Sequence, residues 1–361
     1  MNVATVRTDP NALVYPIAGR PEQGEVMEVA EGVFWVRMAI PIKGLDYINL
    51  WLLDDGDGWT LIDTGLRTPS IRETWERIIE SHLGGRPIRR VICTHFHPDH
   101  MGQAGWFVRR FDAPLCMTLG EWLFGRCLLL EQEAHPPAAA VTFYRRGGFS
   151  EEELEVYAKR PYDRFKEAVC HLPTGFSRIE DGQSLRIGGR SWRVMVGRGH
   201  SPEHACLYCA ELGLLISGDQ ILPRITPHIG VYPMEPDADP LRFYLNSLGL
   251  FRGLPADTLV LPAHGDPFRN LSARLDQIGA HHHDRLRALL EALAEPKTVV
   301  EVLPVLFRRD HGGEHKFLAH GEALAHLHWL LNEGLIERQE DSDGVHRFLA
   351  EGADAPALLR I

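Results

Sequence analysis

The sequence predicts an α/β fold followed by a small C-terminal helical, winged-helix-like domain, and three patterns support this. Strand-like and helical segments alternate between residues 33 and 120, an order typical of α/β proteins. A second set of strand-like runs follows between residues 183 and 218. Beyond residue 270, helical segments precede one predicted hairpin. We therefore expect a main domain over residues 1–269 and a linking helix with the winged-helix-like domain over residues 270–361.

The main domain begins with predicted strands. The runs VFWVRM, YINLWLL and WTLIDTG are bounded by turn residues, which predicts strands joined by hairpins. A helix is expected next, starting at a capping box of Ser70 and Glu73 and ending at Gly84 or Gly85. The strand RRVIC and the helix MGQAGWFVRRF then complete an α/β unit.

Residues 121–178 differ from this pattern and are expected to form a helical insertion. They contain apolar helical segments, a Pro-Pro break and a capping box of Ser150 and Glu153. Further on, a long helix is predicted over residues 270–294 and another over residues 315–332. The last predicted element is a hairpin with Asp343-Gly344 at its turn.

Composition excludes several classes of protein. The 38 Lys and Arg residues against 49 Asp and Glu give a net charge of −11, which disfavours nucleic acid as a partner. No stretch approaches the roughly 18 consecutive apolar residues of a membrane helix, and the polar, proline-broken N-terminus is unlike a signal peptide. We therefore expect no membrane association and a cytoplasmic location. Six dispersed cysteines predict no disulfides.

The densest group of chemical side chains lies in the segment THFHPDH, directly after a predicted strand. His95, His97, Asp99 and His100 offer imidazole nitrogens and a carboxylate, which suit Zn²⁺ or another first-row metal. From an extended loop His95 and His97 can point one way, while Asp99 and His100 turn toward a second position. One loop can therefore serve two metal ions.

Three further candidates each follow an apolar strand-like run. They are His200 in GRGHSPEH, Asp219 in LLISGDQ and His264 in LVLPAHGDP. Functional groups gather at strand ends in α/β architectures. We therefore expect these side chains to join the histidines of the THFHPDH segment.

These motifs resemble those of the metallo-β-lactamase-fold superfamily of hydrolases, over roughly residues 30–268. The resemblance implies an αββα sandwich holding two divalent metal ions, zinc in first place and iron or manganese as alternatives. It implies seven metal ligands: His95, His97, Asp99, His100, His200, Asp219 and His264. Asp219 would bridge the metals, and Asp63 in LIDTG would lie beneath them and orient ligands.

The resemblance also implies a mechanism in which a metal-bridging hydroxide attacks a carbonyl carbon. Asp99 would orient the hydroxide and pass its proton to the leaving group, so Asp99 and Asp219 are the predicted catalytic residues. GHSPEH is similar to the GHTPGH segment of glyoxalase II-like enzymes, with Glu203 in place of glycine. A small thioester of the acyl-CoA or acyl-glutathione type is the first expected substrate, followed by a lactone.

Three alternatives remain open at this stage. Relatives with a similar tail include RNA-cleaving enzymes, so the chain can be a metal-dependent single-strand ribonuclease. It can also resemble the mono-iron persulfide dioxygenases, although these need only part of the ligand set. A non-catalytic sensor that binds nucleic acid through its tail is the third, but acidic residues outnumber basic ones there.

Specificity is expected to come from the insertion and from the loop after Asp219, which would line the pocket. His228 and Tyr232 are candidate hydrogen-bond donors to the substrate, and Arg145 is a candidate partner for an anionic group. The tail is expected to serve packing or dimerisation, which predicts a homodimer.

Other suggestive residues have simpler interpretations. Cys206 and Cys209 are expected to be packed on opposite sides of one strand. His204 is expected to make a structural hydrogen bond, and the histidines at 281–283 to lie on a partly solvated helix face.

Overall fold

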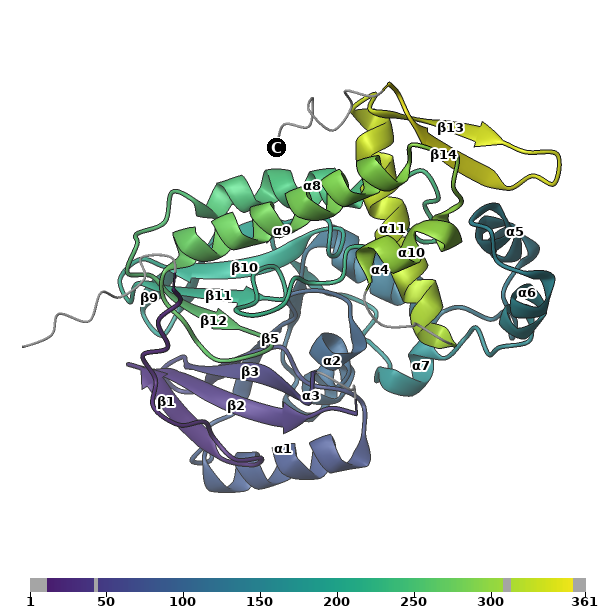
Figure 1. The fold of residues 1–361 in the computed structure, drawn as a ribbon. Coiled ribbons are helices and arrows are strands. Elements are labelled where there is room, and N and C mark those ends of the chain that lie inside the picture. Colours follow the sequence, from purple (N-terminus) through teal and green to yellow (C-terminus); the bar gives the residue numbers. More distant parts are fainter. Residues whose placement is uncertain (1–11, 42–44, 308–312, 353–361) are drawn as a thin grey trace, which may run out of the picture.

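A computed structural model describes residues 12–41, 45–307 and 313–352. Two β-sheets pack face to face, and helices cover both outer faces (Figure 1). This is the αββα sandwich that the motifs implied. Within the described residues no helix is long and apolar enough to cross a membrane.

The first sheet has seven strands in the order β1 to β7. Neighbouring strands are antiparallel from β1 through β4 and parallel from β4 through β7. The strands are β1 Val26–Ala30, β2 Val33–Ala39, β3 Tyr47–Asp54, β4 Trp59–Ile62, β5 Ile88–Ile92, β6 Leu115–Met117 and β7 Ser177–Arg178. The predicted hairpins of the first half are confirmed.

The second sheet has five strands in the order β12-β11-β10-β9-β8. Only the β11–β12 pair is parallel, because α8 (Pro240–Leu248) and the loop before it separate these two strands in the chain. The strands are β8 Ser184–Ile187, β9 Arg190–Gly197, β10 His204–Cys209, β11 Leu214–Gly218 and β12 Leu259–Pro262. The hairpins predicted between residues 183 and 218 are thus present.

Buried side chains alternate along the strands and form separate apolar layers. One layer lies between the sheets and includes Trp35, Trp51 and Leu207. Cys206 and Cys209 belong to different layers, on opposite faces of β10, as expected. All six cysteines are free.

The helix after β4 begins differently from the prediction. The helices here are α1 Pro69–Ser81, α2 Pro98–Met101 and α3 Ala104–Phe111. Thr68, not Ser70, caps α1, and its hydroxyl accepts a hydrogen bond from the Ile71 amide. Pro69 explains the shift, because proline is favoured at the first helical position and sets the start of the helix.

The insertion is helical, but it divides between two cores. Its helices are α4 Leu119–Leu129, α5 Ala138–Arg146, α6 Glu151–Ala158 and α7 Phe165–Ala168. Trp122 of α4 packs with the core of the first sheet. Phe143 and Tyr157 of α5 and α6 instead join the core of the C-terminal helices. The Ser150–Glu153 capping box is confirmed.

The C-terminal region contains the predicted helices and hairpin. Its elements are α9 Leu271–Ala292, α10 Val299–Leu306, α11 Glu314–Asn332, β13 Ile336–Glu340 and β14 His346–Ala350. Helix α8 Pro240–Leu248 and the short 3₁₀ helix Gly249–Phe251 precede it and pack on the second sheet with α9. One expectation is wrong: His282 is buried against His326 of α11 rather than partly solvated, because α9 packs against α11.

Candidate metal centre

The candidate ligands lie in loops that follow buried strands. The loop after β5 carries the THFHPDH segment, and α2 starts within it. His200 follows β9, Asp219 follows β11 and His264 follows β12. The strands end at one edge of the sandwich, so loops distant in sequence meet there (Figure 1).

The seven predicted residues form two groups. His95, His97, His200 and Asp219 form the first, and their potential ligand atoms all lie within 4.8 Å of one another. The second group consists of Asp99, His100 and His264, within the same limit. The structure therefore brings together every residue of the predicted set.

Asp219 joins the two groups. Its Oδ2 lies 3.4 Å from Nε2 of His200 in the first group and 3.6 Å from Nε2 of His100 in the second. Its Oδ1 lies 3.5 Å from Nε2 of His264. One carboxylate thus faces both groups of candidate ligands.

Asp63 lies beneath this arrangement and orients it. Its carboxylate accepts hydrogen bonds from the amide and hydroxyl of Thr94, at 2.7 and 2.8 Å. It also accepts one from Nδ1 of His100 at 2.8 Å, which leaves Nε2 of His100 to face Asp219. Asp63 adopts φ of 58°, a costly conformation for a non-glycine residue that is found preferentially at functional sites.

Backbone carbonyl groups orient two further histidines. Nδ1 of His200 donates to the carbonyl of His228 at 2.8 Å, and Nδ1 of His264 donates to that of Tyr47 at 2.9 Å. Such hydrogen bonds fix the ring and its tautomer, and they direct Nε2 toward the space that the other candidate ligands surround.

The two groups differ in electrostatics. Burial lowers the pKa of His95 well below its ordinary value and that of His97 to about 3, with neighbouring histidines adding to the effect. Burial also opposes protonation of His100 and His264, but the charges of Asp99 and Asp219, joined at His100 by that of Asp63, outweigh it and raise both pKa values. Neutral imidazoles and ionised carboxylates are the forms that bind metals.

Unpartnered buried atoms test whether a metal fits. Nε2 of His100, Nε2 of His264 and Oδ1 of Asp219 are buried without a hydrogen-bond partner. Buried polar atoms are otherwise almost always satisfied. Because these three atoms converge on one space and belong to good zinc ligands, the residues present fit divalent metal ions.

His204 supports the loop that carries Asp219. Its Nε2 accepts a hydrogen bond from the Asp219 amide at 3.0 Å, as the structural interpretation of this residue expected. Glycine at position 218 makes this approach possible, because a Cβ atom there would lie only 2.5 Å from the His204 ring. Gly218 also has a φ of +51°, a conformation that glycine adopts at little cost.

Two supporting residues were missed at the sequence level. The buried carboxylate of Glu121 accepts hydrogen bonds from the Phe96 amide, the Ser201 hydroxyl and the Glu203 amide, so it ties two ligand-bearing loops together. Burial raises the pKa of Glu121 to about 7, although these hydrogen bonds lower it. Asn49 donates to the carbonyls of Pro262 and Gly265 on either side of His264.

The three residues predicted to contact the substrate, His228, Tyr232 and Arg145, lie in surroundings that differ from one another. The ring of His228 lies 3.5 Å from Glu322 of α11, so the C-terminal region reaches the loop that orients His200. Tyr232 is partly exposed and its ring centre lies 6.1 Å from that of His228. Arg145 forms an exposed ion pair with Glu151 on α5 and α6, at the outer edge of the molecule (Figure 1).

Comparison with known proteins identifies the family. The model of the metallo-beta-lactamase superfamily matches residues 44–264, and that of the metallo-beta-lactamase-like C-terminal domain matches residues 286–351. The chain belongs to the metallo-beta-lactamase superfamily, and it is a metallohydrolase. A beta-lactamase domain protein from Burkholderia ambifaria has a similar structure, with 41% identity and a TM-score of 0.85 over 94% of this chain and 97% of that one.

Several curated relatives are more distant. The lactamase-like protein adaB of Aspergillus niger is 26% identical over 95% of this chain and 94% of its own. The acyl-coenzyme A thioesterase MBLAC2 of Bos taurus is 26% identical over 54% of this chain, and the atrochrysone carboxyl ACP thioesterase of Aspergillus fumigatus is 24% identical over 69%. This chain spans 64% and 45% of the lengths of those two thioesterases.

Proposed function

We propose that this metallohydrolase holds two divalent metal ions, zinc in first place, and hydrolyses a small thioester, with a lactone or ester as the next class. The observation that carries the proposal is the position of Asp219, whose carboxylate faces both ligand groups. The two distant relatives that are named thioesterases support the choice of bond.

Two divalent ions in such a site would activate a water molecule as a nucleophile and polarise the carbonyl of the substrate. Residues of the chain itself hold the candidate ligands in place. His200 and His264 are held by backbone carbonyls, so their Nε2 atoms need no rearrangement on binding. Asp63 holds His100 in the same way.

Asp99 is the proposed proton carrier. Its Oδ2 lies 3.3 Å from Nε2 of His264 and 3.7 Å from Nε2 of His100. Burial favours the neutral acid, but these two histidines outweigh it and lower the pKa of Asp99, so the carboxylate is a base at neutral pH. It can accept a proton from the attacking water and pass it to the departing sulfur as the C–S bond breaks.

A substrate panel on the metal-loaded protein tests this function. Thioesters, lactones, esters and a short single-stranded RNA are compared at equal concentrations, and metal content is measured on the same sample. We expect thioester turnover that is lost on chelation and restored by zinc. RNA cleavage without thioester turnover, or one iron per chain without hydrolysis, would overturn the proposal.

A further inference from the structure

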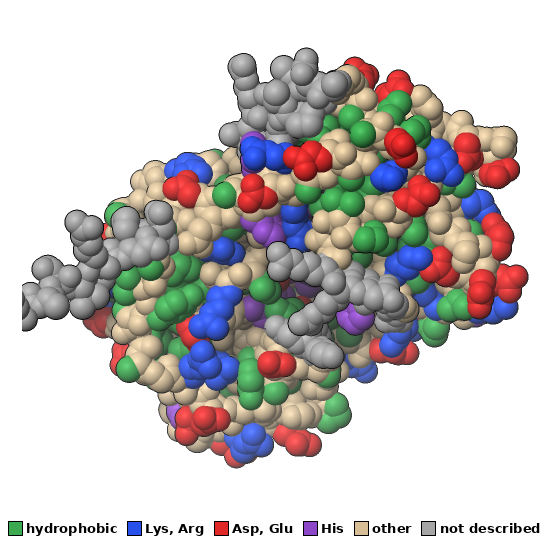
Figure 2. All heavy atoms as spheres, in the orientation of Figure 1, with side chains coloured by type: hydrophobic (Ala, Val, Ile, Leu, Met, Phe, Trp, Pro, Cys, Tyr) green, Lys and Arg blue, Asp and Glu red, His purple; other side chains and the backbone are tan. Residues whose placement is uncertain are grey.

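A pocket of about 330 Å³ opens beside His264 and is unusually rich in arginine. Arg20, Arg37 and Arg224 line it, together with Asp46 and Asp266. In a chain with a net charge of −11, three guanidinium groups around one cavity next to a metal ligand are unexpected. Figure 2 shows His side chains in a hollow of this face, with Lys or Arg side chains along part of its rim.

The charges of these arginines are only partly balanced. Arg20 forms a two-pronged ion pair with Asp266, at 2.5 and 2.6 Å. Arg37 and Arg224 stack on aromatic rings instead, 4.1 Å from the centre of Tyr47 and 5.7 Å from that of Tyr15. In the described part of the chain neither of these two forms an ion pair, so their hydrogen-bond donors are available to a ligand.

The surroundings of Arg37 disfavour its positive charge, so a bound anion would stabilise it. Arg37 is half-buried, and burial together with the charge of Arg20 lowers its pKa. A carboxylate or phosphate would satisfy its donors in the planar, two-pronged geometry that guanidinium groups favour.

The pocket is directly connected to the metal centre. Tyr47 supports Arg37 with its ring, while its carbonyl accepts the hydrogen bond that orients His264. Arg224 lies in the loop after Asp219, five residues beyond that shared carboxylate. A ligand that touches both arginines therefore lies close to the reacting bond.

We propose that this cavity, here called the arginine pocket, binds an anionic oxygen group that the substrate carries near the bond to be hydrolysed. The inference rests on the proposed function and narrows its substrate class to acyl thioesters with a carboxylate or phosphate. The carboxylate would belong to the acyl part, and the phosphate to the thiol part.

Four thioesters distinguish these two sources. Butyryl and succinyl groups are each attached to uncharged N-acetylcysteamine and to 4′-phosphopantetheine, and kcat/KM is measured for all four. We expect at least one anionic member to exceed butyryl-N-acetylcysteamine by about 10- to 100-fold, as charge-assisted hydrogen bonds allow. A higher kcat/KM for the two succinyl thioesters than for the two butyryl thioesters indicates that the pocket binds a carboxylate of the acyl part. A higher kcat/KM for the two phosphopantetheine thioesters than for the two N-acetylcysteamine thioesters indicates that it binds a phosphate of the thiol part.

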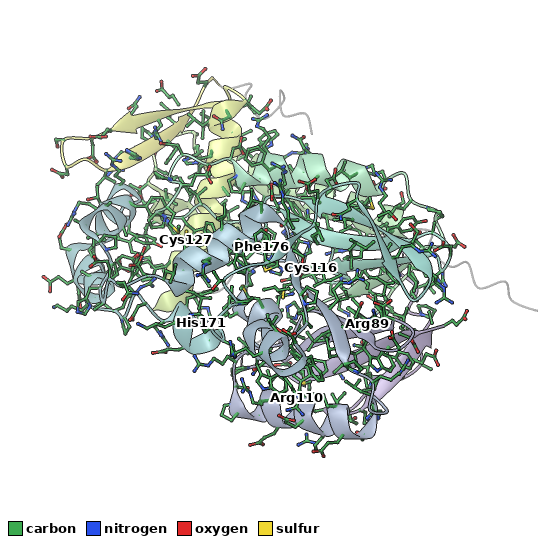
Figure 3. The ribbon with its side chains drawn as sticks, turned by 180° about the vertical axis from the view of Figure 1, so that it is seen from behind. Arg89, Arg110, Cys116, Cys127, His171 and Phe176 are labelled. Atoms are coloured by element: carbon green, nitrogen blue, oxygen red, sulfur yellow. The ribbon has the colours of Figure 1, made fainter. Side chains whose placement is uncertain are left out.

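Amino-acid substitutions test whether the preference for an anionic substrate comes from the arginine pocket. In R37Q/R224Q the ratio of kcat/KM between the preferred anionic substrate and its neutral counterpart should fall at least tenfold, and the exposed R224Q alone should lower it in part. The matched control is R110Q: Arg110 lies on α3 on the opposite side of the molecule, where it pairs with Glu76 of α1 (Figure 3). An unchanged ratio in R37Q/R224Q would overturn the proposal.

A binding measurement separates this inference from the proposed function. Succinate and inorganic phosphate are titrated calorimetrically into the metal-loaded wild type, R37Q/R224Q and R110Q. We expect at least tenfold weaker binding of one anion in the double variant alone. If no thioester is hydrolysed but this loss is seen, the proposed function fails and the pocket stands. Equal binding in all three proteins would contradict the pocket.

Discussion

The candidate metal centre and the helices α9 and α11, here called the helical region, both contain several buried histidines, but their neighbours differ. At the centre, burial lowers the pKa values of His95 and His97, but Asp99 and Asp219 raise that of His264 and, together with Asp63, that of His100. In the helical region burial dominates, and it lowers the pKa of His281, His282, His320, His326 and His328.

The hydrogen bonds of the two regions differ as well. In the helical region His282 pairs with His326 and His328 donates to the Ala238 carbonyl, while both ring nitrogens of His320 are buried without a hydrogen-bond partner. Glu322 is a carboxylate in this region, but Arg285 and His228 engage it. The histidines of the candidate metal centre therefore share their space with several carboxylates, whereas Glu322 of the helical region is paired with Arg285 and His228.

The largest effect is expected from removing the shared carboxylate. D219N should lower kcat/KM by more than the roughly 10²–10³-fold typical of losing one transition-state-stabilising group, since both ligand groups lose a partner. Steady-state kinetics on the preferred thioester check this. H326N, in the helical region, is the contrast, and its activity per folded molecule should fall far less. Equal losses in the two variants would remove the distinction between the regions.

A smaller effect is expected from Asp63, which contacts a ligand rather than a metal. D63N weakens the hold on His100 and should lower metal affinity by about 10- to 100-fold. Competition with a coloured chelator measures it. D284N, an exposed carboxylate of α9, is the matched control, and no difference between the two variants would show that Asp63 does not orient the centre.

The helical region should respond to acid. His320 has a pKa lowered to about 3 from an ordinary value of 6.5, mainly by burial. Below pH 6.5 the unfolded chain binds a proton at His320, but the folded protein, in which the ring is buried and neutral, does not. The folded state therefore loses stability relative to the unfolded state as the pH falls below 6.5. Between pH 7 and pH 5 the free energy of unfolding should fall by about 2 kcal/mol through this residue.

Urea unfolding at these two pH values checks the expectation. H320L should remove that part of the pH dependence, whereas H315L, at an exposed histidine of the same helix, should keep it. A pH dependence that is identical in H320L and the wild type would show that folding does not lower the pKa of His320.

The smallest effect is expected from Arg145, the arginine that sequence reasoning chose for the substrate. R145Q removes only an exposed ion pair with Glu151, and exposed pairs contribute little to stability. Neither KM nor the unfolding midpoint should change. A fall in the preference for the anionic substrate comparable to that in R37Q/R224Q would make Arg145 part of the pocket.

The ligand set was predictable because each member follows a buried strand within a short, recognisable motif. The αββα sandwich was implied by the family resemblance that these motifs carry. The supporting contacts were not predictable, because they join residues far apart in the chain, such as Glu121 with Phe96 and Asn49 with Pro262. No local pattern marks such a partner.

Tertiary packing also explains the errors within elements. His282 fits a partly solvated face when α9 is considered alone, but α11 covers that face. The insertion reads as one helical unit, yet the aromatic side chains of α5 and α6 pack against Phe317 and His320 of α11. The start of α1 at Pro69 rather than at the Ser70 capping box shows one local signal overriding another.

Metal content per chain, measured by elemental mass spectrometry after exhaustive dialysis, tests the central claim most directly. We predict about two divalent ions in the wild type, fewer in D219N, and an unchanged number in a variant with both H282N and H326N. One ion or fewer in the wild type, or metal lost from the helical-region variant but kept in D219N, would contradict the assignment of both ions to the centre around Asp219.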